Sequence, residues 1–462
     1  MNQIFRKMGY ETVPDEFYAD IDKWLSWYKG KVSSFHRYNQ YNGKKLIARE
    51  RATASFAKKV CEDWANLILN ERVDINIGKL KVKKDVLKVL DKNNFRVFAN
   101  RLAEITFALG TGAFVEYKDG DEIKIDYISA DMIYPLSWSN GQILECAFAS
   151  EKIIDKKKVI YVNMHILENG RYKIVNKMFE KSKEIPLPEG VSEVVYTNSK
   201  RPFFQIITPN IINNVDFKNP MGISVFANSI DILKGIDLIY DSYQNEFRLG
   251  KKRIIVPVGM AQMMSDSTGL TPVFDDNDTE FYAIKANDSL TEIKEINMTL
   301  RSQEHETALN RNLNLLSSKC GLGNARYEIT KTGIKTATEV ISEKSELYEN
   351  LKKHQLVMEK AICNLVYAIA YLLGYDDDFE VSINFDDSVI EDTSSISSRM
   401  LDEYKNGVID DVEYFMKVYN LTEDMAIEKS KKIAKRKAAK EAMEKEIFQK
   451  SENFKNDAAG IN

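Results

Sequence analysis

The longest regular hydrophobic pattern in the chain runs from Thr336 to Leu373, where apolar residues return every three or four positions. This spacing predicts a single helix, roughly 55 Å long at about 1.5 Å per residue, which should act as a spine for other elements. Thr336 and Glu339 form a capping-box pair at its start, and Gly374 supplies the left-handed residue that commonly ends a helix. From Ala361 onward the helix is apolar on almost every side, so we expect that end to be buried. The apolar positions are Val340, Leu347, Leu351, Met358, Leu365, Ile369 and Leu372.

The N-terminal part of the chain is predicted to be mainly helical. The pattern indicates one helix with an aromatic face before Gly30, a second from about Leu46 to Asn70, and another that ends at Gly110. A short strand is expected over Val73–Gly78. The apolar faces consist of Phe17, Ile21, Trp24, Leu25 and Tyr28 in the first helix, of Ala57, Val60, Cys61, Trp64, Leu67 and Ile68 in the second, and of Phe95, Phe98, Leu102 and Leu109 in the last.

From Ala113 the pattern alternates with a period of two, which is typical of strands. Asp119-Gly120, Asn140-Gly141 and Asn169-Gly170 stand between alternating segments and predict β-hairpins. Together with the preceding helices these strands predict a mixed α+β domain.

A helix with two different faces is predicted from about Gly222 to Leu249. A short β module follows, with strands at Ile254–Val256, near Phe281–Ala286 and at Ile293–Ile296, and with a loose segment around Asp275–Asp278. One face of the helix carries Ile232, Ile236, Ile239, Tyr243 and Phe247, and the other carries Asp231, Lys234, Asp237, Asp241, Asn245 and Arg248.

A further helix, from about Leu300 to Cys320, should return from the β module, and Gly321 and Gly323 end it. Its apolar stripe is thin, consisting of Leu309, Leu313, Leu316 and Cys320. A loop over residues 324–335 leads into the long helix, Phe379–Phe385 alternates as a strand, and the chain from Ser394 onward is helical and charged. Two helices around a small β tip predict a protrusion rather than a closed catalytic fold.

Composition points to no strong electrostatic partner. The 462 residues include 65 basic and 69 acidic side chains, for a formal charge of -4. The four cysteines are scattered, which favours a reducing, cytoplasmic setting. We expect no signal peptide and no membrane span, because the N-terminus lacks an apolar core and Asn364 interrupts the most apolar run.

Few residues are arranged as a reaction site would need. Gly110-Thr111-Gly112 lies between a helix and a strand, the reverse of a dinucleotide loop, and the chain contains no phosphate-binding GxxxxGK[ST] sequence. The histidines are isolated from one another in the sequence and form no HExxH pair: His36, His165, His305 and His354. We therefore expect no catalytic residue, no cofactor and no metal site.

Two charged features keep other functions open. The acidic runs Asp275–Asp278, Asp376–Asp378 and Asp386-Asp387 could bind a divalent cation, although solvated turns are the simpler interpretation. The basic segment Lys429–Lys440 is interspersed with glutamates, which favours an exposed, salt-bridged helix over a DNA contact. A metal-dependent nuclease or a soluble DNA-binding protein thus remains as an alternative to a structural assembly protein.

Several stretches, taken in order, resemble the portal proteins of tailed bacteriophages, particularly those of long-tailed phages of Gram-positive hosts. The stretches are Ile21–Gly30, Phe35–Tyr38, Lys58–Leu67, Gly110–Phe114, Asn219–Phe226, Gly235–Asp241, Thr336–Val340 and Phe385–Ser388. The resemblance covers nearly the whole chain to about residue 425.

The resemblance implies a ring, usually of about twelve subunits, at one capsid vertex, through which genome DNA enters and leaves. The implied partners are other copies of the chain, double-stranded DNA bound without sequence specificity, the terminase large subunit, a head-completion or adaptor protein, and the major capsid and scaffolding proteins. No membrane is implied, and assembly would take place in the host bacterial cytoplasm. In that family's terms the chain divides into a wing (residues 1–220, with the spine helix and strand of 336–393), stem helices (221–249 and 300–320), a clip (250–299), a tunnel loop (321–335) and a helical crown (394–462).

The resemblance also suggests roles for three groups of residues. The polar face of the first stem helix would line a wet channel, a basic cluster would stand where the clip begins, and the tunnel loop would project into the channel. These groups are Asp231, Lys234, Asp237, Asp241 and Arg248 on the stem, Lys251, Lys252 and Arg253 at the clip, and Asn324, Arg326, Tyr327, Glu328 and Lys331 in the loop.

Overall fold

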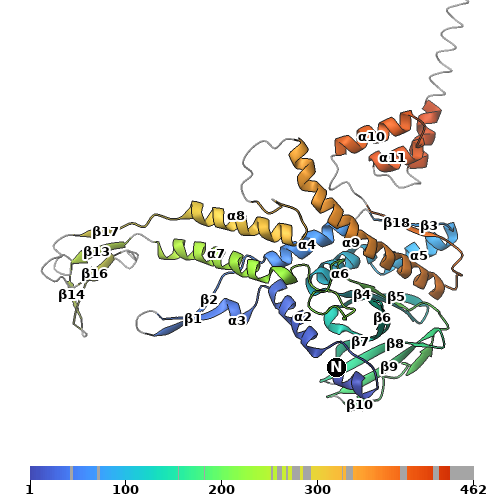
Figure 1. Ribbon diagram of the computed structural model, residues 1–462, viewed down its shortest axis with the longest axis horizontal. Coiled ribbons are helices and arrows are strands. Elements are labelled where there is room, and N and C mark those ends of the chain that lie inside the picture. Colours follow the sequence, from blue (N-terminus) through green and yellow to red (C-terminus); the bar gives the residue numbers. More distant parts are fainter. Residues whose placement is uncertain are drawn as a thin grey trace, which may run out of the picture. The chain divides into compact units, whose positions relative to one another are not determined.

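The computed structural model describes residues 1–41, 45–69, 73–154, 156–181, 183–250, 253–257, 263–266, 269–272, 281–284, 293–324, 326–328, 337–385, 393–419 and 426–436. The chain divides into two compact units, Met1–Phe385 and Asp386–Asn462, and each is described by itself. With 46% helix and 26% strand, the structure confirms the α+β class (Figure 1).

The largest sheet is an antiparallel meander in the first unit. Its strands are β6 (Ile133–Ser139), β7 (Gln142–Ile154), β8 (Lys157–Glu168), β9 (Arg171–Glu180) and β10 (Lys183–Ile185), and β11 (Val194–Tyr196) also pairs with β9. Both expected Asn-Gly hairpins are confirmed. Asn140, Gly141, Asn169 and Gly170 have φ angles of 51°, 73°, 50° and 75°, the left-handed values that such tight turns need.

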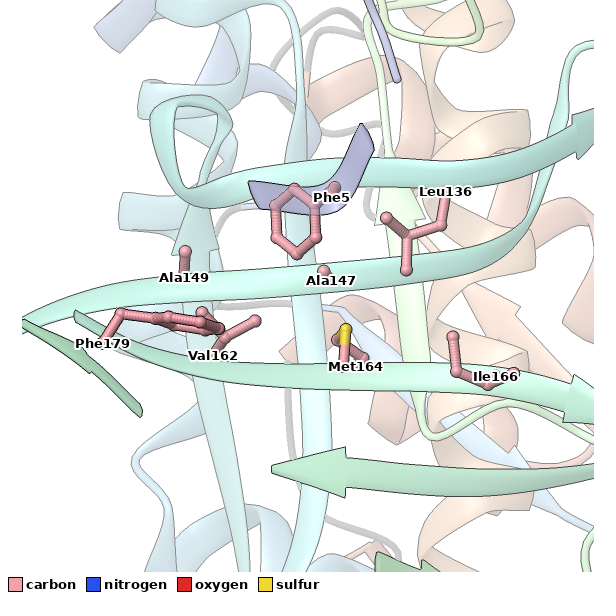
Figure 2. Close-up of a cluster of buried hydrophobic side chains, with 8 residues drawn as sticks. All are labelled: Phe5, Leu136, Ala147, Ala149, Val162, Met164, Ile166 and Phe179. Carbon is pink, nitrogen blue, oxygen red and sulfur yellow. The ribbon is translucent and has the colours of Figure 1, made fainter. Parts of the chain in front are cut away.

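A short helix covers one face of this sheet. Helix α1 (Asn2–Lys7), which the sequence pattern did not predict, places Phe5 at 0% exposure against the strands (Figure 2). The cluster consists of Phe5, Leu136, Ala147, Ala149, Val162, Met164, Ile166 and Phe179. Small alanines on β7 leave the room that the Phe5 ring occupies.

A second sheet packs on the opposite face, and helices cover it in turn. Its order is β12 (Phe204–Ile207), β4 (Gly112–Asp119) and β5 (Glu122–Ser129), the last two joined by the expected Asp-Gly turn. The Phe204 ring lies 5.7 Å from Phe148 and 5.3 Å from His165 of the large sheet. Phe114 of β4 points the other way and meets Phe95 of α6 (Phe95–Leu109). The core of this part of the first unit therefore has a sheet–sheet–helix arrangement.

The N-terminal helices follow the pattern with one correction. Helix α2 (Asp15–Tyr28) buries Phe17, Ile21 and Trp24 as expected, and α6 ends at Gly110. The helix expected from Leu46 begins only at Phe56, as α4 (Phe56–Ile68), because Leu46–Glu50 is strand β2. Strand β2 pairs with β1 (Arg37–Tyr41), which follows the short helix α3 (Ser33–His36). Helix α5 (Leu80–Lys92) was not predicted, although Val82, Val86 and Leu90 give it a buried stripe.

The long helix is confirmed as α9 (Ala337–Leu372), and it packs against α4, α5, β4, β12 and β18. Gly374 has φ +87°, and the amides of Gly374 and Tyr375 bond to the Tyr371 and Ala370 carbonyls at 2.9 Å each, which completes a Schellman end. Thr336 of the expected capping box lies outside the described residues. The segment Ser345–Leu372 is apolar enough to cross a membrane by length and hydropathy alone, yet its apolar side faces the protein core. Strand β18 (Val381–Asn384) then pairs with β3 (Asp74–Ile77). Both strands were predicted from the sequence, whereas their pairing was not.

The protrusion consists of α7 (Ile230–Leu249), a small sheet and α8 (Ser302–Lys319). The sheet places β13 (Arg253–Pro257) between β16 (Phe281–Ile284) and β17 (Lys294–Ile296). The segment expected to be loose instead contains a hairpin, β14 (Met263–Asp266) with β15 (Gly269–Pro272). Residues 275–278 lie outside the described residues.

Helix α7 begins at Ile230, eight residues later than the sequence predicted, because the preceding segment is used for packing. A Cβ on Gly222 would lie 2.3 Å from the Gly110 carbonyl oxygen, so the two backbones are in direct contact. The Gly222 amide also donates to the Thr111 hydroxyl at 3.1 Å, and the Val225 amide to the Phe107 carbonyl at 2.9 Å. These contacts fix residues 222–225 against α6 and the residues that follow it, in a conformation that is not helical.

The second unit is helical over its described part, as the sequence predicted. It contains α10 (Thr393–Lys405), α11 (Asp411–Tyr419) and a helical segment over residues 426–436. The Tyr404 hydroxyl donates to Asp411 at 2.6 Å, which joins the first two helices.

We expect Gly222→Ala to lower the free energy of unfolding by about 1–3 kcal/mol, the usual cost of forcing extra atoms into a packed site. Urea unfolding followed by circular dichroism would measure it. Gly78→Ala is the matched control, because its Cβ would meet nothing closer than 3.7 Å. Equal stability of the two variants would show that the Gly110–Gly222 contact yields easily.

Candidate functional site

The two protrusion helices run antiparallel and touch along their length. At the domain end, the Cys320 thiol lies 3.9 Å from the Ser229 hydroxyl. Further along, a Cβ on Gly235 would come within 3.1 Å of the Asn312 amide, so the helices approach closely there. The predicted thin stripe of α8 is confirmed, since Leu313 is buried in this contact.

A small ion cluster ties the far ends of the same helices together. Glu246 of α7 accepts hydrogen bonds from the Arg301 backbone amide at 2.9 Å and guanidinium Nε at 2.6 Å, and His305 lies 3.4 Å away. These bonds, the Arg301 amide first, lower the pKa of Glu246 to about 2. The Tyr243 ring packs edge-on against His305 at 5.9 Å. The two helices therefore form one rigid pair.

Asp237 lies on the expected polar face of α7 but is only 4% exposed. One carboxylate oxygen lies 3.0 Å from His36 Nε2, and the other accepts from the Ala54 amide at 2.8 Å and the Thr53 hydroxyl at 3.2 Å. The Val32 amide donates to His36 Nδ1 at 3.0 Å, so this network assigns the imidazole proton to Nε2, which donates to Asp237. A buried carboxylate with this many donors is satisfied by its own chain.

Asp241, one helical turn after Asp237, also accepts a hydrogen bond from the N-terminal segment. Its carboxylate accepts from the Ala52 amide and the Asn245 side chain, each at 3.0 Å. Leu238 between them is 52% exposed. The expectation of one exposed polar face therefore fails at Asp237 and Asp241, because His36 and residues 52–54 contact them.

The remaining predicted stem and clip residues are placed as follows. Asp231 and Lys234 are paired with each other at 2.8 Å at the start of α7, and Arg248 is exposed near its end. Arg253 is half-buried at the start of β13, whereas Lys251 and Lys252 lie outside the described residues. Their roles in a channel stay predictions.

The segment after α8 is fastened to the domain rather than hanging free. Gly321 and Gly323 have φ angles of +77° and +74°, as expected of residues that end the helix, and Leu322 between them is buried. The Trp64 indole donates to the Cys320 carbonyl at 3.0 Å, and the Asn350 amide of α9 donates to the Gly321 carbonyl at 3.2 Å.

Two predicted loop residues are held by one carboxylate of α4. The Tyr327 hydroxyl donates to Asp63 at 2.8 Å, and Arg326 lies 3.6 Å from the same side chain, which Lys59 also contacts at 2.6 Å. Burial, together with Asp63, raises the pKa of the Tyr327 hydroxyl well above its usual range, so it stays a donor. The Tyr327 ring meets Phe56 edge-on at 5.4 Å.

The beginning of the loop is therefore anchored, which corrects the expectation that its polar side chains are all free to meet water or DNA. Asn324 is exposed and Glu328 half-buried, whereas Lys331 lies outside the described residues. The anchor could not be found from the sequence, because Asp63 is about 260 positions away from the loop.

The acidic runs form no metal centre in the part of the chain that the structure describes. No group of three or more His, Cys, Asp or Glu side chains there could hold a metal ion. Asp377 pairs with Arg201 at 2.8 Å, and Asp378 pairs with Lys79. Residues 386–387 are outside the described residues. These carboxylates balance local charge.

The basic C-terminal segment is helical up to residue 436, the last residue that the structure describes. Lys432 pairs with Glu428 at 3.0 Å, the expected one-turn ion pair. Lys429 instead lies over the Tyr419 ring at 3.5 Å.

The sequence of the chain matches a protein-family model over residues 10–442, nearly its whole length. The family is described as phage portal protein, SPP1 Gp6-like. The chain belongs to this family. Phage portal proteins are structural rather than enzymatic and sit at the capsid vertex of the virion. No curated protein matches the chain. The resemblance seen in the sequence is thereby confirmed, and the portal role replaces the nuclease and DNA-binding alternatives.

We expect Asp237→Asn to loosen residues 46–54 of this portal protein, because an amide nitrogen would face donors that the carboxylate now accepts. Hydrogen bonds to a charged acceptor are worth about 1.5–3 kcal/mol each, so local opening should become at least tenfold more frequent. Hydrogen–deuterium exchange of peptides over Ala52 and Ala54 would measure it. Asp231→Asn, on an exposed side chain of the same helix, should leave that exchange unchanged. Unaltered exchange in Asp237→Asn would show that the carboxylate does not hold this segment.

Proposed function

We propose that this chain forms a closed portal ring whose central channel carries genome DNA into the capsid and out again. The family match over residues 10–442 carries the proposal. A portal subunit needs a mixed domain and a stiff protrusion. The layered wing core and the α7–α8 pair supply elements of both kinds.

The parts of the ring follow from the elements. The wing consists of residues 1–220 together with α9 and β18, the stem of α7 and α8, and the clip of residues 250–299. Residues 321–335 form the tunnel loop and 394–462 the crown. Asp231 and Lys234 are the stem side chains that remain for the channel, since Asp237 and Asp241 are occupied and Arg248 lines a hollow with Tyr38 and Arg49.

The same proposal assigns the partners. The clip, with Lys251, Lys252 and Arg253 where it begins, is the docking site for the terminase large subunit and later for a head-completion protein. Major capsid and scaffolding proteins surround the wing and crown, and assembly takes place in the host bacterial cytoplasm. DNA passes without sequence readout, so its binding should be weak and salt-dependent, as contacts to backbone phosphates are.

The ring is tested by mass. Because a head-to-tail contact closes into a ring when the rotation allows, the purified chain should form one large species of many 53.0 kDa subunits. Mass photometry at increasing concentration would measure it, and negative-stain images should show a central hole. A chain that remains monomeric or dimeric at micromolar concentration contradicts the proposal.

The tunnel loop is tested by replacement. We expect a Gly/Ser linker in place of residues 324–328 to leave the ring assembled, because the helices on either side keep their own contacts. Packaging or retention of DNA should fail, measured as nuclease-protected genome in assembled heads. Tyr327→Phe is the control that removes only the hydrogen bond to Asp63 and keeps the contact with Phe56. If the linker variant packages and holds DNA like the parent, the loop is only a connector.

A further inference from the structure

The hairpin of β1 and β2, here called the arm, has one face that is exposed to solvent over its described residues. Its register places Arg37 opposite Glu50, Asn39 opposite Ala48, and Tyr41 opposite Leu46. Side chains directly opposite one another share a face of a sheet, so these residues form one surface, the outer face. All of them are exposed, and Leu46 at 66% is the largest aliphatic side chain among them. The alternate residues Tyr38, Ile47 and Arg49 form the inner face and are half-buried.

The inner face lies against α7. Tyr38 and Arg49 line one side of a polar hollow of about 420 Å³, and Asp241, Asn245 and Arg248 of α7 line the other. The base of the arm is fixed more firmly, since His36 and residues 52–54 bond to Asp237 and Asp241. Arg51 also lies over the Phe35 ring at 4.3 Å and the Tyr38 ring at 4.9 Å. The arm is therefore held in place before any partner arrives.

The arm and α8 lie on opposite sides of α7. Successive residues of a helix turn by about 100°, which places Asp237 and Asp241 roughly opposite the Tyr243 and Glu246 side that meets α8. Figure 1 shows the arm and α8 on the two sides of α7. The elements thus form a row in the order arm, α7, α8, and each end of the row has an uncovered face.

The exposed side of α8 carries charged and apolar side chains, as the outer face of the arm does, and the two surfaces lie at similar levels along the axis of α7. Glu304, Thr307 and Arg311 recur at helical spacing, are exposed, and point away from α7. Just before α8, Met298 is 59% exposed and Leu300 39%.

The heights follow from contacts already described. The base of the arm bonds to Asp241, which is close along the axis to Tyr243 and hence to the His305 level of α8. Ala48 and Arg49 line the hollow together with Arg248, and Arg301 pairs with Glu246, so the arm beyond Ala48 lies near the level of the segment before Arg301. Arg37 and Glu50 thus stand at the height of Glu304 and Arg311, and Leu46 at the height of Met298.

We propose that the outer face of the arm binds the uncovered side of α8, together with Met298, in a second copy of this chain. The inference rests on the proposed ring and names the contact that passes from one stem to the next. The two ends of the row are different surfaces, so the contact is head-to-tail and can repeat until the ring closes. The neighbouring subunit supplies the apolar contact for Leu46, which is exposed in the single subunit.

Paired cysteines test the contact. In a Cys363→Ser background, whose other thiols are buried, Leu46→Cys combined with Met298→Cys should give a ladder of disulfide-linked species under mild oxidation. Each chain then carries one thiol at each end of the row, so linkage can continue from subunit to subunit. Leu46→Cys alone should give no ladder. Leu46→Cys with Ile153→Cys is the matched control, because Ile153 is an 81% exposed strand residue away from the row.

A charge substitution tests the energetics independently. Leu46→Asp should raise the concentration needed for ring formation at least about tenfold, the effect of losing one well-packed apolar contact. Ile153→Asp should not change it. Both positions are exposed in the subunit, so the folded state should be kept, and circular dichroism would verify this.

The outcomes separate the two proposals. Rings of the parent chain that give no ladder, and that form equally well with Leu46→Asp, overturn the arm contact and leave the ring intact. A parent chain that never forms rings overturns the ring and this inference with it. A ladder from the Leu46→Cys and Met298→Cys pair, absent in both controls, supports the contact.

Discussion

The buried carboxylate of Asp237 joins helix α7 to the N-terminal segment that carries His36, Thr53 and Ala54. A charge taken out of water costs several kcal/mol unless hydrogen bonds replace its hydration. Here His36, Thr53 and Ala54 provide those bonds. The arrangement ties the position of the arm to that of α7, because the residues that bury the Asp237 carboxylate are also the ones that donate its hydrogen bonds. The arm, the row it forms with α7 and α8, and the assignment of the remaining polar residues to the channel all depend on this site.

A similar dependence holds the other end of the stem. Asp63 on α4 gathers Tyr327, Arg326 and Lys59, while Trp64, the next residue, holds the Cys320 carbonyl. Neighbouring positions of one wing helix thus fasten both the end of α8 and the start of the loop. On the far side of Trp64, the His354 ring of α9 stacks edge-on at 4.7 Å. Burial, and Lys353 beside it, lowers the pKa of His354 to about 3, which keeps its Nδ1 free of a proton to accept the Asn210 amide. The end of α8 and the long helix α9 are therefore joined through Trp64 and through the hydrogen bond from Asn350 to Gly321.

The wing has a layered construction in which each layer leaves room for the next. Alanines of β7 admit Phe5 on one face of the large sheet, while Phe204 carries the contact to the second sheet on the other. At the root of the stem, Gly110 and Gly222 let two backbones touch where no side chain would fit. Close-packed layers with such backbone contacts yield little to strain.

Much of this protein could be predicted from local pattern alone. The long helix, α2, α6, the Asn-Gly hairpins, β3, β18 and the return of two helices around a β module all follow from hydrophobic period and turn chemistry, which act between near neighbours in the chain. The order of the motifs further pointed to the portal family, which the match over residues 10–442 confirms.

Features that depend on contacts between distant parts of the chain became known only from the tertiary structure. The sequence pattern predicts that Leu46–Glu50 begins a helix, but its pairing with Arg37–Tyr41 makes it a strand. The pattern also predicts a helix over Gly222–Phe226, but Gly222 packs directly against Gly110. Asp237 looks like a solvated residue because its period places it among polar neighbours, yet it is buried by a segment about 200 positions away. Tyr327 looks free for the same reason. The free energy of a buried charge or a bonded hydroxyl depends on which distant groups surround it, and the order of residues along the chain does not specify that environment.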